Sequence, residues 1–210
     1  MNRIIHIPKT GGTSIRKSNT FKFKRSISWG NYLKTTHIPI SEFNSQIYFK
    51  FHAFVRDPLE RAVSQYYYFR KRMRRANLVN DWWSEVCFSF DDVNDFYEWV
   101  DLERMSKVIV HLLPQCEFLR VSDSSRTTSS ISLYDFGDFY HEWLRLCKST
   151  KVNPKGISKL NSSKKAHTNL TQSNIDKLTE FYELDFALYD MAKDKYKSKV
   201  RDLTAQLYDV

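Results

Sequence analysis

The chain has 210 residues, 41% of them hydrophobic and 15% aromatic, which is enough apolar material for the core of one domain and excludes an intrinsically disordered chain. Lysine and arginine number 33 against 24 aspartates and glutamates, and the net charge of +9 favours a polyanionic ligand or surface as a partner. The longest apolar runs fall far short of the roughly 18 residues that a membrane-spanning helix needs, and the first residues lack the apolar core of a signal peptide. We therefore expect a soluble protein.

Strand and helix signals alternate along the first half of the chain. Residues 3–7 predict a short buried strand, residues 8–12 a loop, and residues 13–17 the start of a helix in which Thr13 or Ser14 can satisfy free N–H groups. Residues 18–47 carry no clear pattern. Aromatic and β-branched residues predict a second strand over 48–55, and apolar residues at helical spacing predict helices over 59–75 and 91–105.

The second half continues the alternation. Short strands are predicted over 117–121 and 131–136, and a Ser- and Thr-rich surface loop separates them. A helix is predicted over 139–147, and a basic loop follows over 149–168. A second helix is predicted to start after Thr171, which caps it, and a third is predicted over 185–200. The pattern predicts an α/β fold for one domain over 1–210, with a mainly parallel central sheet flanked by helices. Ligands bind such sheets at the carboxyl ends of the strands.

The three cysteines, Cys87, Cys116 and Cys147, are widely spaced and form no C-x-x-C pair. This spacing predicts neither a disulfide framework nor a zinc cluster. We expect buried, reduced thiols and no metal centre.

The loop after the first strand, within HIPKTGGTS, has the composition of an anion-binding turn. Two of only five glycines, Gly11 and Gly12, are adjacent there, which indicates a backbone shape that a Cβ would prevent. A strand, a glycine turn and a helix start direct backbone N–H groups toward one point, and Lys9 adds a full charge. A turn that needs glycine for shape alone would look the same, and the pattern is not Walker A, because the lysine precedes the glycines. The candidate anion-binding residues are Pro8, Lys9, Thr10, Gly11, Gly12, Thr13 and Ser14.

A second candidate motif, FVRDPLERAVS, follows the second predicted strand. Arg56 leaves the end of that strand, and Ser64 lies about two turns into the next helix. The arginine fork matches phosphate oxygens, and a serine hydroxyl can complete such a site. Equally, Arg56 can pair with Asp57 or Glu60, with Ser64 a small residue in a helix contact.

Together these motifs, with NSSKK and FYELDFALYD near the end, resemble the Golgi-type carbohydrate sulfotransferases. The likeness is greatest to the heparan 2-O- and chondroitin/dermatan-type branch and its short bacterial and viral relatives, and it weakens across 76–105 and 122–130. The resemblance implies a P-loop-like fold that binds 3'-phosphoadenosine 5'-phosphosulfate (PAPS). It also implies in-line transfer of the sulfuryl group to a hydroxyl of a carbohydrate acceptor.

The resemblance also assigns roles to individual residues. The 5'-phosphosulfate loop falls on residues 8–14, with Lys9 at the bridging oxygen, and the 3'-phosphate contacts fall on Arg56 and Ser64. The loop that closes over the cofactor falls on 161–164 and adds Ser163 and Lys164 to the cofactor-binding residues. A family histidine that precedes the second motif falls on His37.

Sulfuryl transfer needs aligned oxygens, stabilised charge and a base for the nucleophile. We predict that His37 is the general base and that Lys9 stabilises negative charge on the leaving phosphate. His52, in the second strand, is the alternative base. The other four histidines are interpreted as facing the sheet, structural or solvent-facing: His6, His111, His141 and His167.

The run RKRMRR over 70–75 has two interpretations. It is either a solvated helix end, stabilised by the helix dipole, or an electrostatic path for an acidic polysaccharide. The aromatic residues at 66–69 cannot all be core at helical spacing, so one or two of them are expected to line the cofactor or acceptor cleft. The pair Trp82-Trp83 is interpreted as packing rather than as a sugar-stacking surface.

Two other function classes share some of these features. A P-loop kinase would share the fold, but the Walker Lys-Ser/Thr position and an evident Mg²⁺-holding aspartate are missing. A non-catalytic polyanion- or nucleic-acid-binding module would explain the charge, but no zinc-finger, homeodomain or RNP pattern occurs. We expect a carbohydrate partner, an anionic polysaccharide being one candidate, and no nucleic acid. A chain that starts on its first strand predicts a cytoplasmic enzyme of bacterial or viral origin, or a Golgi-lumen enzyme if it is trimmed from a longer one.

Overall fold

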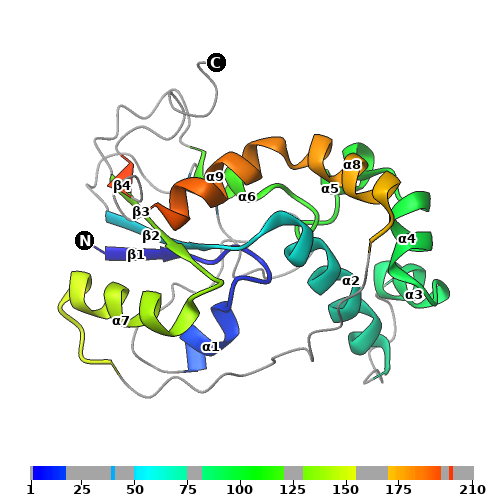
Figure 1. Ribbon diagram of the computed structural model, residues 1–210. Helices are drawn as coiled ribbons and strands as arrows, with labels where there is room; N and C mark the ends of the chain where they lie inside the picture. The colour runs from blue at the N-terminus through cyan, green and yellow to red at the C-terminus, as the bar shows by residue number, and fades with distance from the viewer. Residues whose placement is uncertain are drawn as a thin grey trace.

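The computed structural model of the protein describes residues 2–17, 39–40, 50–74, 82–120, 130–154, 170–194 and 199–200 (Figure 1). Within these residues, four strands form one sheet in chain order: β1 (Asn2–Ile5), β2 (Lys50–Val55), β3 (Ser130–Asp135) and β4 (Lys199–Val200). β1, β2 and β3 are parallel, whereas the short β4 runs antiparallel to β3. The α/β fold with a mainly parallel sheet is therefore confirmed.

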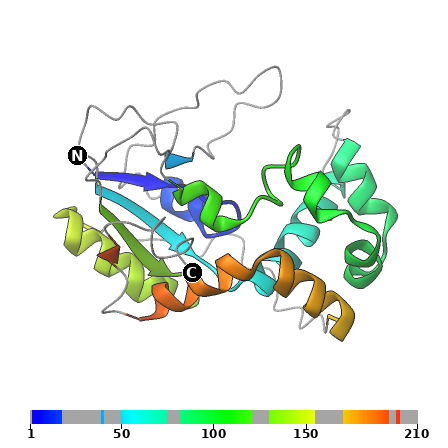
Figure 2. The ribbon, with the colours of Figure 1, turned by 90° about the horizontal axis from the view of Figure 1, so that it is seen from above.

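Helices cover both faces of the sheet, as the two views show (Figures 1 and 2). α1 (Gly12–Lys17) and α7 (Phe139–Thr150) lie on one face, and α6 (Gln115–Leu119) and α9 (Glu183–Lys193) lie on the other. The middle strand β2 is apolar toward both layers. Phe51 and Val55 join the α6–α9 core, and Phe54 joins Trp143 in the α7 core. A strand buried on both faces reads as a continuous apolar run, which is why its sequence carried a clear strand signal.

A second apolar core lies among helices beyond the sheet (Figure 2). α2 (Pro58–Arg74) leads from the sheet into it and packs with α3 (Trp82–Ser89), α4 (Val93–Trp99), α5 (Leu102–Ser106) and α8 (Gln172–Phe181). On α2, Ala62, Tyr66 and Phe69 are buried at helical spacing. Trp83 is buried against Phe69, so it packs in the core as predicted.

Two further findings bear on the sequence predictions. The cysteines Cys87, Cys116 and Cys147 are buried thiols, as expected. No helix among the described residues is long and apolar enough to cross a membrane.

The strand predicted over 117–121 is wrong. These residues belong largely to the helix α6, which follows Pro114 and carries Glu117 in its first turn. Cys116, Phe118 and Leu119 are all buried, and a short, fully buried apolar run has the same sequence pattern in a helix and in a strand.

The helix predicted over 91–105 is two helices, α4 and α5. Val100 is extended between them, and the side chain of Asp101 accepts a hydrogen bond from the N–H of Arg104 to start α5. The ammonium group of Lys177 on α8 donates to the carbonyl oxygens of Tyr97 and Val100, 2.7 Å from each, at the end of α4. A partner so distant in the chain is not visible in the local pattern.

The helix predicted over 185–200 has different limits. α9 begins at Glu183 and ends at Lys193, and residues 199–200 form β4 instead. β4 pairs with β3, where Val200 lies opposite Ile131. Pairing with a strand far away in the sequence therefore decides the structure of 199–200.

Thr171 caps α8 as predicted, and its removal should cost stability. Its hydroxyl oxygen accepts a hydrogen bond from the N–H of Asn174. We expect Thr171→Ala to lower the free energy of unfolding by about 1 kcal/mol in urea titrations, because the first turn loses an acceptor. Thr171→Ser keeps the oxygen and should stay close to wild type. Equal losses in both variants would contradict the capping role.

Candidate functional site

The carboxyl ends of β1, β2 and β3 lie at one edge of the sheet, and each leads through a turn into a helix (Figure 1). We name these the lysine turn (residues 8–14, after β1), the arginine turn (residues 56–57, after β2) and the phenylalanine turn (residues 136–138, after β3). The N–H of Phe136 donates to the carbonyl oxygen of Val55, 2.8 Å away, which joins the phenylalanine turn to the end of β2, directly before the arginine turn. The parallel sheet thus brings together segments that are far apart in the sequence.

The backbone of the lysine turn is tightly curled. Lys9 and Gly11 both have a positive φ, of 69° and 83°. The hydroxyl of Thr10 donates to the carbonyl oxygen of Ile7, and the N–H of Ser14 donates to the carbonyl oxygen of Gly11 as α1 begins. For lysine the left-handed conformation costs roughly 1–2 kcal/mol, so surrounding contacts must hold it there.

The two adjacent glycines meet different needs. At Gly11 the positive φ requires glycine, and a Cβ would also lie 2.8 Å from the rings of Phe136 and Phe139. At Gly12 a Cβ would lie 1.8 Å from Nε2 of His6. The His6 ring therefore packs against the start of α1, which is a more specific place than the expected contact with the sheet.

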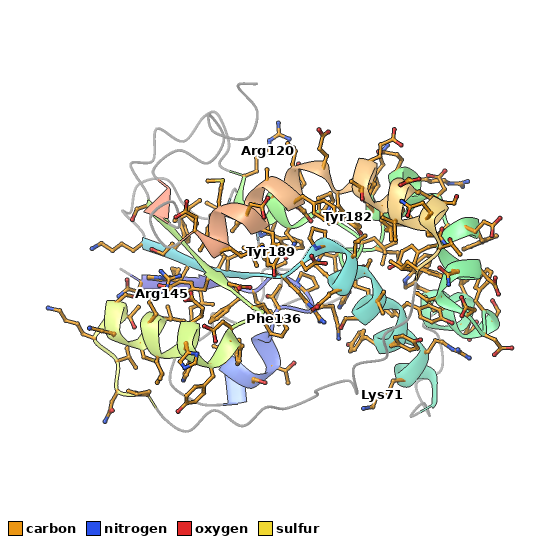
Figure 3. All side chains as sticks on the ribbon, viewed as in Figure 1. Lys71, Arg120, Phe136, Arg145, Tyr182 and Tyr189 are labelled. Carbon is orange, nitrogen blue, oxygen red and sulfur yellow. The ribbon has the colours of Figure 1, made fainter. Side chains whose placement is uncertain are left out.

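Arg56 converges with the lysine turn. Its Nη1 donates to the carbonyl oxygen of Lys9 at 3.5 Å, and its guanidinium lies 5.1 Å from the ring centroid of Phe136, at the end of β3 (Figure 3). Arg56 also pairs with Glu60 at 3.3 Å, so the alternative predicted from the sequence is present too. Because the Glu60 side chain is 64% exposed, this pair contributes little and leaves Arg56 available to an anion.

Lys9 lies among positive charges. Burial, and then the charges of Arg56 and Lys71, lower the pKa of Lys9 to about 8. Its ammonium lies 4.4 Å from the ring centroid of Tyr68, and no carboxylate among the described residues lies within ion-pair distance of it. Arg56 and Lys71 thus add positive charge near Lys9, while the charges of Glu60 and Asp57 act on Arg56, their neighbour along the chain. Such a site favours a polyanion.

Helix α2 supplies one wall of this site. Ser64 lies one turn after Glu60, which pairs with Arg56, and one turn before Tyr68, which contacts Lys9. It therefore lies on the helix face between the residue that pairs with Arg56 and the residue that contacts Lys9, and its role in binding phosphate stays a prediction. Lys71 continues the same face one turn later (Figure 3).

The carboxylates of Asp57 and Asp135, at the same edge, accept hydrogen bonds from nearby backbone N–H groups. Asp57 accepts a hydrogen bond from the N–H of Glu60, and Asp135 accepts one from the N–H of Gly137. Burial, followed by the charges of Asp135, Asp57 and Glu60, raises the pKa of Tyr189 on α9 to about 12. The negative charges of these acids therefore act on the Tyr189 hydroxyl, and those of Asp57 and Glu60 act on Arg56 as well.

A sequence model of the sulfotransferase family matches residues 4–192 of the chain. The protein belongs to the sulfotransferase family. That family includes the Golgi carbohydrate sulfotransferases, so the family resemblance of the sequence motifs is confirmed, whereas the branch stays a prediction. No curated protein and no solved structure matches the chain significantly.

Three predicted site residues of this sulfotransferase, His37, Ser163 and Lys164, lie outside the described residues. At the sheet edge the structure brings Arg56 to the turn formed by Pro8, Lys9, Thr10, Gly11, Gly12, Thr13 and Ser14. Ser64 lies further along α2, on the helix face between Glu60 and Tyr68. In the part of the chain that the structure describes, no three histidine, cysteine, aspartate or glutamate side chains gather to hold a metal ion.

The rival base, His52, lies away from this edge. It is 3% exposed, and its ring nitrogens contact the Tyr134 hydroxyl at 3.0 Å and Oδ1 of Asn2 at 3.1 Å. Burial, with the charges of Lys50 and Arg145, lowers its pKa to about 4, so it is neutral near pH 7. It precedes Arg56 by about 13 Å of strand, at about 3.3 Å per residue. We infer that His52 is structural.

Sequence reasoning missed Phe136 at this edge, and it included Tyr68 and Lys71 only within the aromatic residues 66–69 and the basic run 70–75. Phe136 follows β3 directly and touches Arg56, and Tyr68 and Lys71 follow Ser64 along one face of α2. Their positions were a usable signal, since residues that follow parallel strands, or recur one turn apart on a helix, share a surface.

Two residues of the basic run over 70–75, Arg70 and Lys71, have different surroundings. Arg70 is tied to Asp91, with 3.1 Å between Nη2 and Oδ1, and to the Tyr66 hydroxyl. It therefore fastens α2 to the segment before α4. Lys71, by contrast, adds charge near Lys9.

The lowered pKa of Lys9 predicts a pH dependence of anion binding. As pH rises through about 8, Lys9 loses the charge that attracts an anion, so affinity for 3'-phosphoadenosine 5'-phosphate (PAP) should fall severalfold between about pH 7 and pH 9.5. Isothermal titration calorimetry measures the decline. Lys9→Arg keeps its charge throughout this range and should bind with little pH dependence. The same decline in both proteins would show that another group is responsible.

Proposed function

We propose that the protein is a PAPS-dependent sulfotransferase that moves a sulfuryl group onto a hydroxyl of a carbohydrate acceptor. One observation carries the proposal: Arg56 reaches the backbone of Lys9, so the two predicted phosphate-binding motifs face one space. PAPS carries a 5'-phosphosulfate and a 3'-phosphate on one ribose. Two cationic turns side by side match that distribution of charge.

The residues present fit this donor. The lysine turn offers Lys9 and the start of α1 to the 5'-phosphosulfate, and Arg56 with Ser64 offers donors to the 3'-phosphate. When bound, PAPS supplies a sulfuryl group attached to a phosphate leaving group. Lys9 then neutralises charge and fixes orientation for an in-line attack, without having to reorganise. We extend the proposal to Ser163 and Lys164 as residues that close over the donor.

The acceptor is proposed to approach along Tyr68. This ring is 37% exposed and stacks on the ring of His111, with 5.4 Å between centroids and 20° between planes. An exposed aromatic face next to the cations Lys9 and Lys71 suits a sugar that carries acidic groups, which is consistent with a net charge of +9. An anionic polysaccharide is therefore the acceptor class that we favour.

The kinase alternative lacks support at this site. The two aspartates that follow β2 and β3, Asp57 and Asp135, are engaged by backbone N–H groups of their own turns. Asp57 lies next to Arg56 and its charge acts on that guanidinium, so both aspartates already have partners at the edge. A cytoplasmic location stays a prediction.

Ligand-induced stabilisation tests the donor. PAP without metal should raise the melting temperature, by the equivalent of about 2.7 kcal/mol at a hundred times its dissociation constant. ATP with Mg²⁺ and a random oligonucleotide should do so much less. Transfer of labelled sulfate from PAPS to a panel of glycans, with Lys9→Ala as the blank, then tests the reaction. A larger shift with ATP and Mg²⁺ than with PAP would favour a kinase.

The base assignment has its own test. His37→Ala should lower kcat by roughly 10²–10⁴-fold, because the attacking hydroxyl keeps its proton longer, while PAP binding stays nearly unchanged. His141→Ala is a matched control, since its side chain is 75% exposed and its contacts with Asp138 and Tyr140 are local. Near-normal turnover by His37→Ala would refute the assignment.

A further inference from the structure

A buried polar network lies directly behind the lysine and arginine turns. Arg61 on α2, Gln115 at the start of α6 and Asp185 on α9 are each 0% exposed. Burying polar and charged groups is costly unless every group is paired. The contacts of these three side chains suggest a role for them. One end of the network lies on the lysine turn and the other on the arginine turn.

Arg61 holds the lysine turn. Its Nε donates to the carbonyl oxygen of Pro8, the residue before Lys9, at 3.3 Å. Its Nη2 donates to the carbonyl oxygens of Leu113 at 2.7 Å and His111 at 3.1 Å. The same guanidinium therefore ties the lysine turn to the segment that carries His111.

Asp185 connects Arg61 to the start of α6. Its carboxylate lies 3.8 Å from Nη1 of Arg61 and accepts hydrogen bonds from the N–H groups of Gln115 at 2.7 Å and Cys116 at 2.9 Å. Asp185 belongs to FYELDFALYD, the sequence motif to which no role was assigned. Tyr182 of the same motif, at the junction of α8 and α9, donates its hydroxyl to Leu112 (Figure 3).

Gln115 holds the arginine turn. Its Oε1 accepts from the N–H of Arg56 at 3.0 Å, and its Nε2 donates to the carbonyl oxygen of Arg56 at 2.8 Å. Both backbone polar groups of Arg56 are thus fixed by one amide. The network runs from Pro8 through Arg61, Asp185 and Gln115 to Arg56.

We propose that Arg61, Asp185 and Gln115 are positioning residues that fix the separation between the lysine turn and the arginine turn. They thereby make the site selective for a nucleotide with phosphate groups at both the 3' and the 5' positions. The two phosphate groups of such a ligand lie within a limited distance of each other. Two turns that moved independently would rarely contact both phosphate groups at once. This proposal rests on the proposed function.

Gln115→Met tests the proposal. Methionine has a similar volume and keeps the backbone N–H that Asp185 accepts, but it frees both polar groups of Arg56. The affinities for PAP and for adenosine 5'-phosphate, which lacks the 3'-phosphate, are measured together with the melting temperature. We expect PAP to bind about tenfold more weakly and adenosine 5'-phosphate nearly as before, because the displaced side chain is the 3'-phosphate contact.

Asn174→Ala is the matched control. Asn174 is 3% exposed and donates to the carbonyl oxygen of Asn94 at 3.0 Å, in the helical half. It should lower the melting temperature and leave the ratio of the two affinities unchanged. Gln115→Glu gives a second variant in case Gln115→Met does not fold, since it keeps an acceptor for the Arg56 N–H but loses the donor.

The outcomes separate the two proposals. An unchanged ratio in a folded Gln115 variant, or an equal change in Asn174→Ala, overturns the positioning role while the proposed function stands. A wild-type protein that does not prefer PAP to adenosine 5'-phosphate overturns the proposed function, and the positioning role with it.

Discussion

The ion pair between Arg61 and Asp185 is the constraint on which the rest of the structure depends. Both side chains are fully buried, so the pair is favourable only because further hydrogen bonds satisfy its members. Arg61 donates to three backbone carbonyl groups and Asp185 accepts from two N–H groups. The pair joins α2 to α9, and through their partners it joins the first turn of the chain to α6. Removing one member would strand the other charge in the core, at a cost of about 3–5 kcal/mol.

The protein holds Lys9, the lysine that we propose binds phosphate, in an unfavourable state. Lys9 has a left-handed backbone, and burial beside Arg56 and Lys71 destabilises its charged form. The backbone strain and the destabilised charge of Lys9 are both present in the free protein. An anion that neutralises the three cations relieves the electrostatic part, so binding releases free energy that folding has stored. The surrounding contacts, above all that of Arg61 with Pro8, keep the turn in place meanwhile.

Local pattern was sufficient for the elements that carry the site, and insufficient for the network behind it. Adjacent glycines, Pro58 and the apolar spacing of α2 located the turns, because each of these features acts on its own stretch of backbone. The hydrogen bond between Asp185 and the N–H of Gln115 joins residues 70 positions apart, and the sequence around either residue carries no signal of it. Residues 117–121 were misassigned for a related reason. Burial on all sides removes the periodicity that distinguishes a helix from a strand.

The packing around His52 separates this histidine from the candidate site. A continuous series of rings, from Phe136 through Phe139 and Phe54 to Tyr134, fills the core between the site and that histidine. Successive centroids lie 5.4, 5.0 and 5.3 Å apart, and the last ring, Tyr134, contacts His52 itself. A sugar hydroxyl cannot reach His52 through such a core. In the reaction that we propose, the group that accepts the hydroxyl proton therefore has to be another residue, and the exposed Tyr68 ring beside Lys9 marks the side from which the acceptor is proposed to approach.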